Sequence, residues 1–170
     1  MTPAELLVDA FSRIREGVHE VIGGLSPAEL SHQPAPGANS IAWLVWHLTR
    51  IQDDHVAEVA GREQVWAEDG WAQRLALPFT PRDTGYGHTP EQVASVRVSS
   101  GELLTGYFDA VHERTLEFVA GLGPGDLDRV VDERWDPPVT LGVRLVSVLN
   151  DDDQHVGQAA YVRGLLEATR

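Results

Sequence analysis

Four segments of roughly 20 to 28 residues repeat their apolar residues with the period of an α-helix, and this pattern constrains the fold more than any other feature of the sequence. It predicts helices near residues 3–23, 40–60, 100–121 and 140–168. No segment alternates apolar and polar residues for long enough to predict a strand firmly, although residues 128–135 ("DRVVDERW") come closest. Helices of this length are typical of a bundle, so the sequence predicts an all-α fold.

The starts of these segments carry helix-capping signals. The stretch "TPAE" at residues 2–5 combines a threonine cap, a proline at the first helical position and a glutamate that completes a capping box. Ser26 begins a similar stretch, "SPAEL", which predicts one short helical turn. Ser40 caps the second long helix, and "SSGE" at residues 99–102 predicts a capping box for the third.

The connection at residues 62–98 is the longest in the chain and contains several prolines and two tryptophans. A long crossover allows the second and third helices to run parallel, which predicts an up-down-down-up four-helix bundle. A chain of this length is expected to form a single domain over residues 1–170. Long connections are often lids or binding loops, and the alternative is a loop, anchored by Trp66 and Trp71, that caps one end of the bundle.

The composition argues against several classes of function. A net charge of -13 argues against a nucleic-acid partner, because an acidic surface repels phosphate groups. The lack of cysteine removes disulfides and any thiolate nucleophile or ligand from the chain. No apolar run approaches the roughly 20 residues that span a bilayer, and the first residues form a charged amphipathic helix rather than a signal peptide. We therefore expect no association with a membrane and a cytoplasmic location.

The stretch "LNDDDQHVGQ" at residues 149–158 places three aspartates and a histidine inside an otherwise apolar helix. Buried carboxylates are costly unless they are paired or bind a metal ion. Asp151 and His155 are one helical turn apart, so their side chains project from the same face, and Asp152 is also within reach of His155. A carboxylate and an imidazole in this arrangement can chelate a divalent ion together with a ligand on a facing helix.

The facing ligand is expected within "WLVWHLTRIQDDH" at residues 43–55, which contains His47, Asp54 and His55. His47 lies about 10 Å along the helix axis from Asp54 and about 12 Å from His55, so one ion can use only one of these two ends. Periodicity favours His55, which is central in the apolar stripe, but the residue types alone leave the choice open. The remaining histidines are expected on helix surfaces or in loops, and these are His19, His32, His88 and His112.

Two stretches together resemble the DinB-like superfamily, "SIAWLVWHL" at residues 40–48 and "DDDQHVGQAAYVRGLL" at residues 151–166. That superfamily includes metal-dependent bacterial proteins and the N-terminal domain of mycothiol-dependent maleylpyruvate isomerase. The resemblance implies that His47 is the first metal ligand and that the usual HxxxH pair of the last helix falls on Asp151 and His155. Asp151 departs from the common histidine, but the mycothiol-dependent branch similarly has a carboxylate there.

The resemblance therefore implies one divalent ion, zinc or nickel, bound by these three side chains, because a carboxylate shifts the preference towards harder or borderline ions. Asp152 and Asp153 are then expected to point towards polar partners or solvent, because three consecutive carboxylates cannot all face one ion. One alternative is that Asp152 supplies the carboxylate ligand. Another is a member of the superfamily without a metal site, in which Asp151 pairs with Arg144 or Arg163 and His47 is a buried packing residue.

The resemblance also implies an enzyme, because three protein ligands leave positions on the ion open. The ion would activate a water or, as the resemblance favours, the thiolate of a low-molecular-weight thiol such as mycothiol or bacillithiol, for S-transfer or isomerisation of an electrophilic substrate. A metal-dependent hydrolase is one alternative, and a non-catalytic, stress-associated, metal-binding bundle is another. We also expect a homodimer, with some of the five tryptophans as interface anchors.

Overall fold

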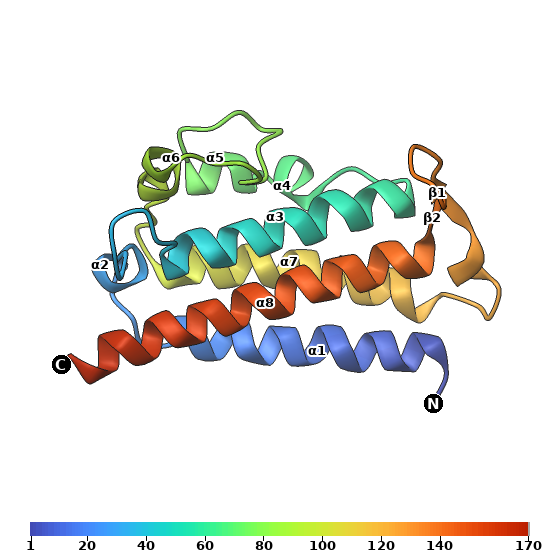
Figure 1. Ribbon diagram of the computed structural model, residues 1–170, viewed down its shortest axis with the longest axis horizontal. Coiled ribbons are helices and arrows are strands. Elements are labelled where there is room, and N and C mark those ends of the chain that lie inside the picture. Colours follow the sequence, from blue (N-terminus) through green and yellow to red (C-terminus); the bar gives the residue numbers. More distant parts are fainter. Residues whose placement is uncertain (170) are drawn as a thin grey trace.

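The computed structural model describes residues 1–169 and consists mainly of helices with one small two-stranded sheet (Figure 1). The mostly helical fold class predicted from the sequence is confirmed. The four long helices are α1 (Pro3–Ile22), α3 (Ile41–Ala60), α7 (Gly101–Ala120) and α8 (Leu141–Ala168), and their bounds agree closely with the predicted ranges. None of the helices within residues 1–169 has both the length and the hydropathy needed to cross a bilayer.

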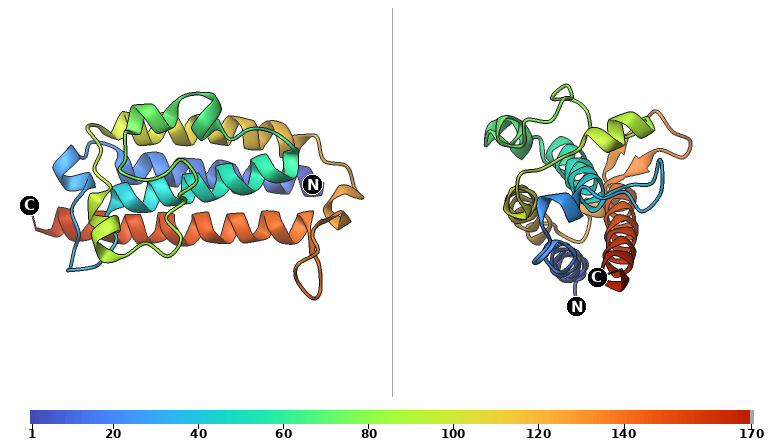
Figure 2. Two further views of the ribbon diagram at one scale, coloured as in Figure 1. Left: turned by 90° about the horizontal axis from the view of Figure 1, so that it is seen from above. Right: turned by 90° about the vertical axis from the view of Figure 1, so that its left-hand side faces the viewer.

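The four long helices lie side by side (Figures 1 and 2). Helix α3 packs against α7 and α8, and α1 packs against the same two helices from the opposite side. The chain runs from right to left along α1 and α8 in Figure 1, and from left to right along α3 and α7. As a consequence, α3 and α8 are antiparallel neighbours, and the middle of one faces the middle of the other.

Most of the predicted helix starts are present. Thr2 and Glu5 form the capping box of α1, and Ser26 and Glu29 form that of the short helix α2 (Pro27–Leu30). The predicted capping box of α7 is absent: Ser100 occupies the N-cap position, but its side chain makes no capping hydrogen bond to the helix. Gly61 ends α3 with a left-handed backbone conformation, which glycine adopts at little cost.

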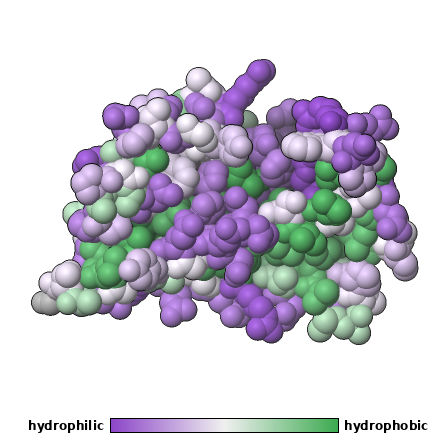
Figure 3. Space-filling model, in the orientation of Figure 1, coloured by the Kyte–Doolittle hydropathy of each residue, from purple (hydrophilic) through white to green (hydrophobic). Residues whose placement is uncertain are grey.

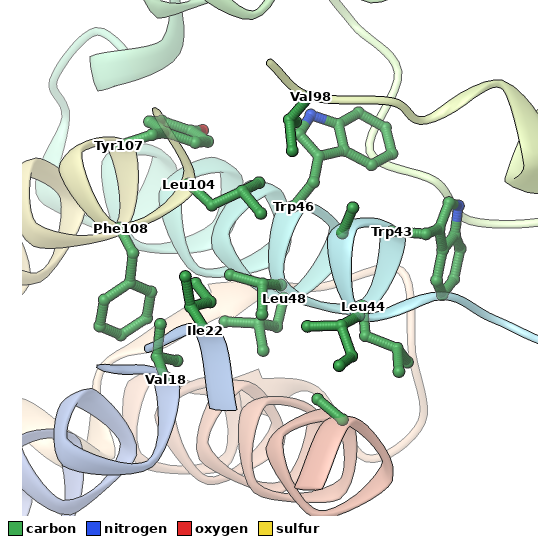
Figure 4. Close-up of a cluster of buried hydrophobic side chains, with 14 of the residues drawn as sticks. Val18, Ile22, Trp43, Leu44, Trp46, Leu48, Val98, Leu104, Tyr107 and Phe108 are labelled. Carbon is green, nitrogen blue, oxygen red and sulfur yellow. The ribbon is translucent and has the colours of Figure 1, made fainter. Parts of the chain in front are cut away.

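The main hydrophobic core lies between α1, α3 and α7 and extends to α8 (Figure 4). Val18 and Ile22 of α1 approach Leu48 of α3 and Phe108 of α7 in this cluster. A smaller cluster occupies the other end of the long helices, and it contains Leu7, Phe11, Val56, Val59, Val119, Leu141, Leu145 and Val148. The helices are therefore held together along their whole length by apolar contacts.

The crossover between α3 and α7 contains three short helices, α4 (Val65–Glu68), α5 (Trp71–Leu75) and α6 (Pro90–Ser95). It lies along the α3 side of the molecule, above α3 in Figure 1, and Trp66 and Trp71 are buried in the main core. Four of the five tryptophans are buried in this way, and only Trp135 is exposed. The expectation that tryptophans anchor an interface is therefore wrong for these four, because each packs inside its own chain.

The connection between α7 and α8 contains a 3₁₀ turn, η1 (Asp126–Asp128), and two short antiparallel strands, β1 (Val130–Asp132) and β2 (Val139–Thr140). Strand β1 falls within residues 128–135, the segment that came closest to a strand pattern. The Asp132 side chain accepts hydrogen bonds from Arg134 and, across the connection, from Arg144 of α8. The small sheet is thereby tied to the start of α8.

Candidate metal centre

His47 of α3 and Asp151 and His155 of α8 converge where the middles of the two helices face each other. One ligand atom from each side chain lies within 4.8 Å of the other two. His47 Nε2 is 4.0 Å from Asp151 Oδ2, and His155 Nε2 is 3.6 Å from Asp151 Oδ1. His47 is buried, and the other two residues are half-buried. The structure thus brings together the three residues that the sequence singled out, while the binding of an ion to them stays a prediction.

Hydrogen bonds fix the orientation of both imidazole rings. His47 Nδ1 lies 2.5 Å from the backbone carbonyl oxygen of Thr84, and His155 Nδ1 lies 3.0 Å from Oε1 of Gln158. Both partners are oxygens that only accept hydrogen bonds, so each Nδ1 carries a proton, and in the neutral ring Nε2 presents a lone pair. Both Nε2 atoms face Asp151. Outer hydrogen bonds of this type orient histidine ligands in metal sites.

The third group, the Asp151 carboxylate, is only partly satisfied by protein groups. Its Oδ1 faces His155, and, against the effect of burial, this contact together with Gln158 raises the pKa of His155. Oδ2 of Asp151 is buried and has no hydrogen-bond partner within residues 1–169. Burial lowers the pKa of His47, so this ring is neutral near pH 7 and does not neutralise the carboxylate. Two imidazole nitrogens and one carboxylate oxygen therefore lie around a common position, and a divalent cation is the group that fits such a set of ligand atoms.

Asp152 and Asp153 do not join this cluster. Asp153 is exposed, as expected, but Asp152 is fully buried and its two oxygens have no hydrogen-bond partner within residues 1–169. The prediction that Asp152 points to polar partners or solvent is wrong, because it occupies the core face of α8 in line with Val148 and Ala159. Burial, with the nearby charge of Asp151, raises the pKa of Asp152 well above its usual range, which favours the neutral acid.

The competing candidates on α3 have other partners. Asp54 accepts a hydrogen bond from Gln64, and His55 Nδ1 is bonded to Arg144. The prediction from periodicity, which favoured His55, is wrong because 15 of the 20 residues of α3 are buried, so its apolar stripe does not mark one face. The prediction that His112 lies on a helix surface or in a loop is also wrong, because its ring is buried against Phe108.

The two arginines proposed as partners for Asp151 are engaged elsewhere. Arg144 bonds to His55, Glu58 and Asp132. Arg163 pairs with Glu167 and donates to the backbone carbonyls of residues 20, 21 and 23. The salt-bridged alternative to a metal centre is therefore not formed.

The crossover contributes directly to the centre through residues 84–88. Gly85 has a φ of +94°, and a Cβ atom there would lie 2.7 Å from Nδ1 of His47. Only glycine allows the chain to pass this close and to place the Thr84 carbonyl against the ring. Trp43 stacks on the ring of His47, with ring centroids 4.7 Å apart, and its Nε1 donates to Nδ1 of His88. The first glycine of "TGYGH" at residues 84–88, Gly85, was the sequence signal for this close approach.

Arg50, a residue that sequence analysis did not single out, holds this part of the crossover. Its guanidinium is fully buried and donates to the backbone carbonyls of Pro81 and Asp83 and to the side chain of Gln64. It also lies 3.6 Å from the buried carboxylate of Asp53. A charged residue one turn after His47 in an apolar helix was the available signal, because such a charge requires partners from another segment.

The fold and the site together define a mainly helical protein with a two-histidine, one-aspartate cluster suited to a metal ion. Residues 10–159 match the sequence profile of the DinB superfamily, and the chain belongs to that superfamily. A solved structure described as the "conserved protein of locus from Enterococcus faecalis" is similar over 99% of each chain, with 32% sequence identity and a TM-score of 0.92. No functionally curated protein matches the chain.

Proposed function

We propose that the protein binds one divalent ion, zinc or nickel, through His47, Asp151 and His155 and is an enzyme that uses it. The observation that supports this most strongly is the convergence of three acceptor atoms, one of them a buried carboxylate oxygen with no hydrogen-bond donor within residues 1–169. Such a set is unfavourable when empty and favourable around a cation. When bound, the ion supplies a Lewis acid that stabilises a thiolate or lowers the pKa of a water molecule.

The protein residues have three tasks in this proposal. The two Nε2 atoms and the Asp151 carboxylate hold the ion and leave other positions on it free for a ligand. The Thr84 carbonyl and the Gln158 side chain keep the rings in the ligating orientation. Trp43, stacked on His47 and edge-on to His155, excludes water from one side of both rings.

We propose a low-molecular-weight thiol as cosubstrate, in S-transfer to or isomerisation of an electrophilic substrate. The chain has no cysteine, so a thiol has to arrive with a cosubstrate. Mycothiol is the proposed thiol, because the carboxylate at Asp151 is like that of the mycothiol-dependent branch. Such thiols are kept reduced in the cytoplasm, which is the proposed location. A metal-dependent hydrolase stays as the alternative enzyme.

We also propose that residues 1–170 form a single domain with the up-down-down-up four-helix-bundle topology, which the mutual packing of α1, α3, α7 and α8 supports. For the quaternary structure we propose a homodimer through the outer face of α8. Apolar side chains are exposed along that face, with Val146 at 62% and Tyr161 at 69% exposure. Figure 3 shows two hydrophobic areas on the side of the molecule along which α8 runs, separated by a hydrophilic band.

Cobalt substitution tests the proposed use of the ion. The metal-free protein is loaded with Co²⁺, and a thiol, dithiothreitol or mycothiol, is added while the near-ultraviolet spectrum is recorded. A sulfur-to-cobalt charge-transfer band that His155→Ala abolishes is the expected result. A cobalt spectrum that no thiol changes would favour a closed, non-catalytic metal site or the hydrolase alternative.

A further inference from the structure

A groove of about 970 Å³ opens between the end of α3 and the start of α8. Its lining includes His55 and Glu58 of α3, Arg82 of the crossover, and Val143 and Ser147 of α8. Ser147 lies one helical turn before Asp151, and Arg82 lies two residues before Thr84, whose carbonyl contacts His47. None of the three candidate ligands lines the groove, but its end at Ser147 is one helical turn from Asp151, so a ligand on the ion that extends along α8 would enter it.

His55 is the imidazole in this groove, and its hydrogen bond to Arg144 determines its tautomer. Nη1 of Arg144 lies 2.9 Å from Nδ1 of His55. A guanidinium only donates hydrogen bonds, so Nδ1 must be the acceptor and the ring proton is on Nε2. Arg144 is itself held by Glu58 at 2.9 Å and by the buried Asp132 at 3.3 Å, so it cannot turn away from the ring without losing both.

The same contacts keep His55 neutral. A proton on Nδ1 would face the Arg144 guanidinium at hydrogen-bond distance, where two positive charges repel. Burial and the charge of Arg144 lower the pKa of His55, against smaller opposite effects of Asp54, Glu58 and Asp151. His55 is thus a neutral group with one donor, Nε2–H, and no lone pair free for a metal ion.

We propose that His55 donates a hydrogen bond from Nε2 to a carbonyl or carboxylate oxygen of the ligand whose thiol binds the metal ion. This inference rests on the proposed function and specifies its ligand as a thiol that carries an acceptor oxygen a few bonds from sulfur. Arg82 at the rim is exposed and has no ion pair within residues 1–169, so it adds attraction if that oxygen is a carboxylate. Trp135 and Val143, both largely exposed, offer an apolar wall for the carbon chain.

Three thiols of equal chain length test the proposal on the zinc-loaded, full-length protein. Their dissociation constants are measured for 3-mercaptopropionate, 3-mercaptopropionamide and propane-1-thiol. We expect both oxygen-bearing thiols to bind about five- to tenfold tighter than propane-1-thiol, the effect of one neutral hydrogen bond. His55→Leu should remove this difference, and His55→Gln should retain it, because the glutamine amide can accept from Arg144 and still donate. The exposed His32→Leu is the matched control, and zinc affinity should be equal in all four proteins.

The outcomes separate the inference from the proposed function. Equal binding of the three thiols by the wild-type protein, or a difference that survives in His55→Leu, would overturn the role of His55 and leave the thiol function standing. Tighter binding of 3-mercaptopropionate alone would also overturn that role, because it would assign recognition of the oxygen to Arg82. If none of the three thiols binds, the proposed thiol function fails and this inference fails with it. Nitrogen-15 NMR of the histidine rings gives an independent check, and a proton on Nδ1 of His55 at pH 7 would contradict the proposal.

Discussion

Asp151 is the residue whose chemistry most needs a cation. Its buried Oδ2 has no hydrogen-bond donor within residues 1–169, while Nε2 of each of the two histidines faces the carboxylate. Substitutions of Asp151 test whether zinc binding requires its negative charge or only a ligand atom at this position. We expect Asp151→His to keep one bound zinc ion, since an imidazole at this position completes the HxxxH pattern. Asp151→Leu should weaken zinc binding by more than roughly 100-fold, because losing a ligand costs more affinity than losing a hydrogen-bond partner of a ligand. Competition with a fluorescent chelator measures both, and tight zinc binding by Asp151→Leu would exclude this carboxylate as a ligand.

Gly85 supports the centre without touching the ion. A Cβ there would lie 2.7 Å from Nδ1 of His47, so Gly85→Ala has to displace either the ring or the Thr84 carbonyl. We expect the zinc affinity of Gly85→Ala to fall by about 10- to 100-fold, as for other outer contacts of metal ligands. Gly87→Ala is the control, because Gly87 also has a left-handed φ of +73° but would meet no atom within 4 Å. Equal losses in the two variants would show that backbone strain, rather than contact with His47, is the cause.

At the scale of elements, the crossover depends on a buried charge. Arg50 bonds to two carbonyls of the crossover and lies beside Asp53, whose carboxylate accepts from the backbone of Val65 and Trp66. We expect Arg50→Met to lower the free energy of unfolding by about 3–5 kcal/mol, because it leaves the Asp53 carboxylate buried without its cation. Urea unfolding measures this loss. Hydrogen exchange of residues 80–88 should accelerate in the same variant, and unchanged exchange there would mean that Arg50 does not hold the crossover.

The sequence predicted the bounds of the long helices better than the positions of individual side chains. The helix bounds followed from apolar period and from caps such as Thr2 and Ser26, because both signals are local. The side-chain placements that failed depend on tertiary contacts. His55 could not be separated from His47 because α3 is buried on nearly all sides, and Asp152 interrupts the core face of α8 where the pattern predicts an apolar residue. The cluster of His47, Asp151 and His155 was predictable only because resemblance to a superfamily supplied the long-range pairing.

At the scale of the whole molecule, the buried His112 makes stability depend on pH. Burial, with the charge of Arg15, lowers the pKa of His112 to about 4, whereas the unfolded chain has the ordinary value near 6.5. Between these values the unfolded chain binds the proton more strongly, so this contribution to stability is complete above about pH 6.5 and is lost as pH falls towards 4. The free energy of unfolding should therefore fall less between pH 7 and pH 4.5 in His112→Leu than in the wild-type protein or in His32→Leu. An equal fall in all three would show that His112 does not titrate differently on folding.

The measurement that tests the central claim most directly is the zinc content of the protein after loading and gel filtration. Zinc per chain is determined by plasma mass spectrometry for the wild-type protein and for His47→Ala, His155→Ala and Asp153→Asn. We predict one zinc ion for the wild-type protein and for Asp153→Asn, whose side chain is exposed and outside the cluster. We predict none for the two histidine variants, provided that circular dichroism shows them folded. A full equivalent of zinc in folded His47→Ala, or none in the wild-type protein, would contradict the metal centre.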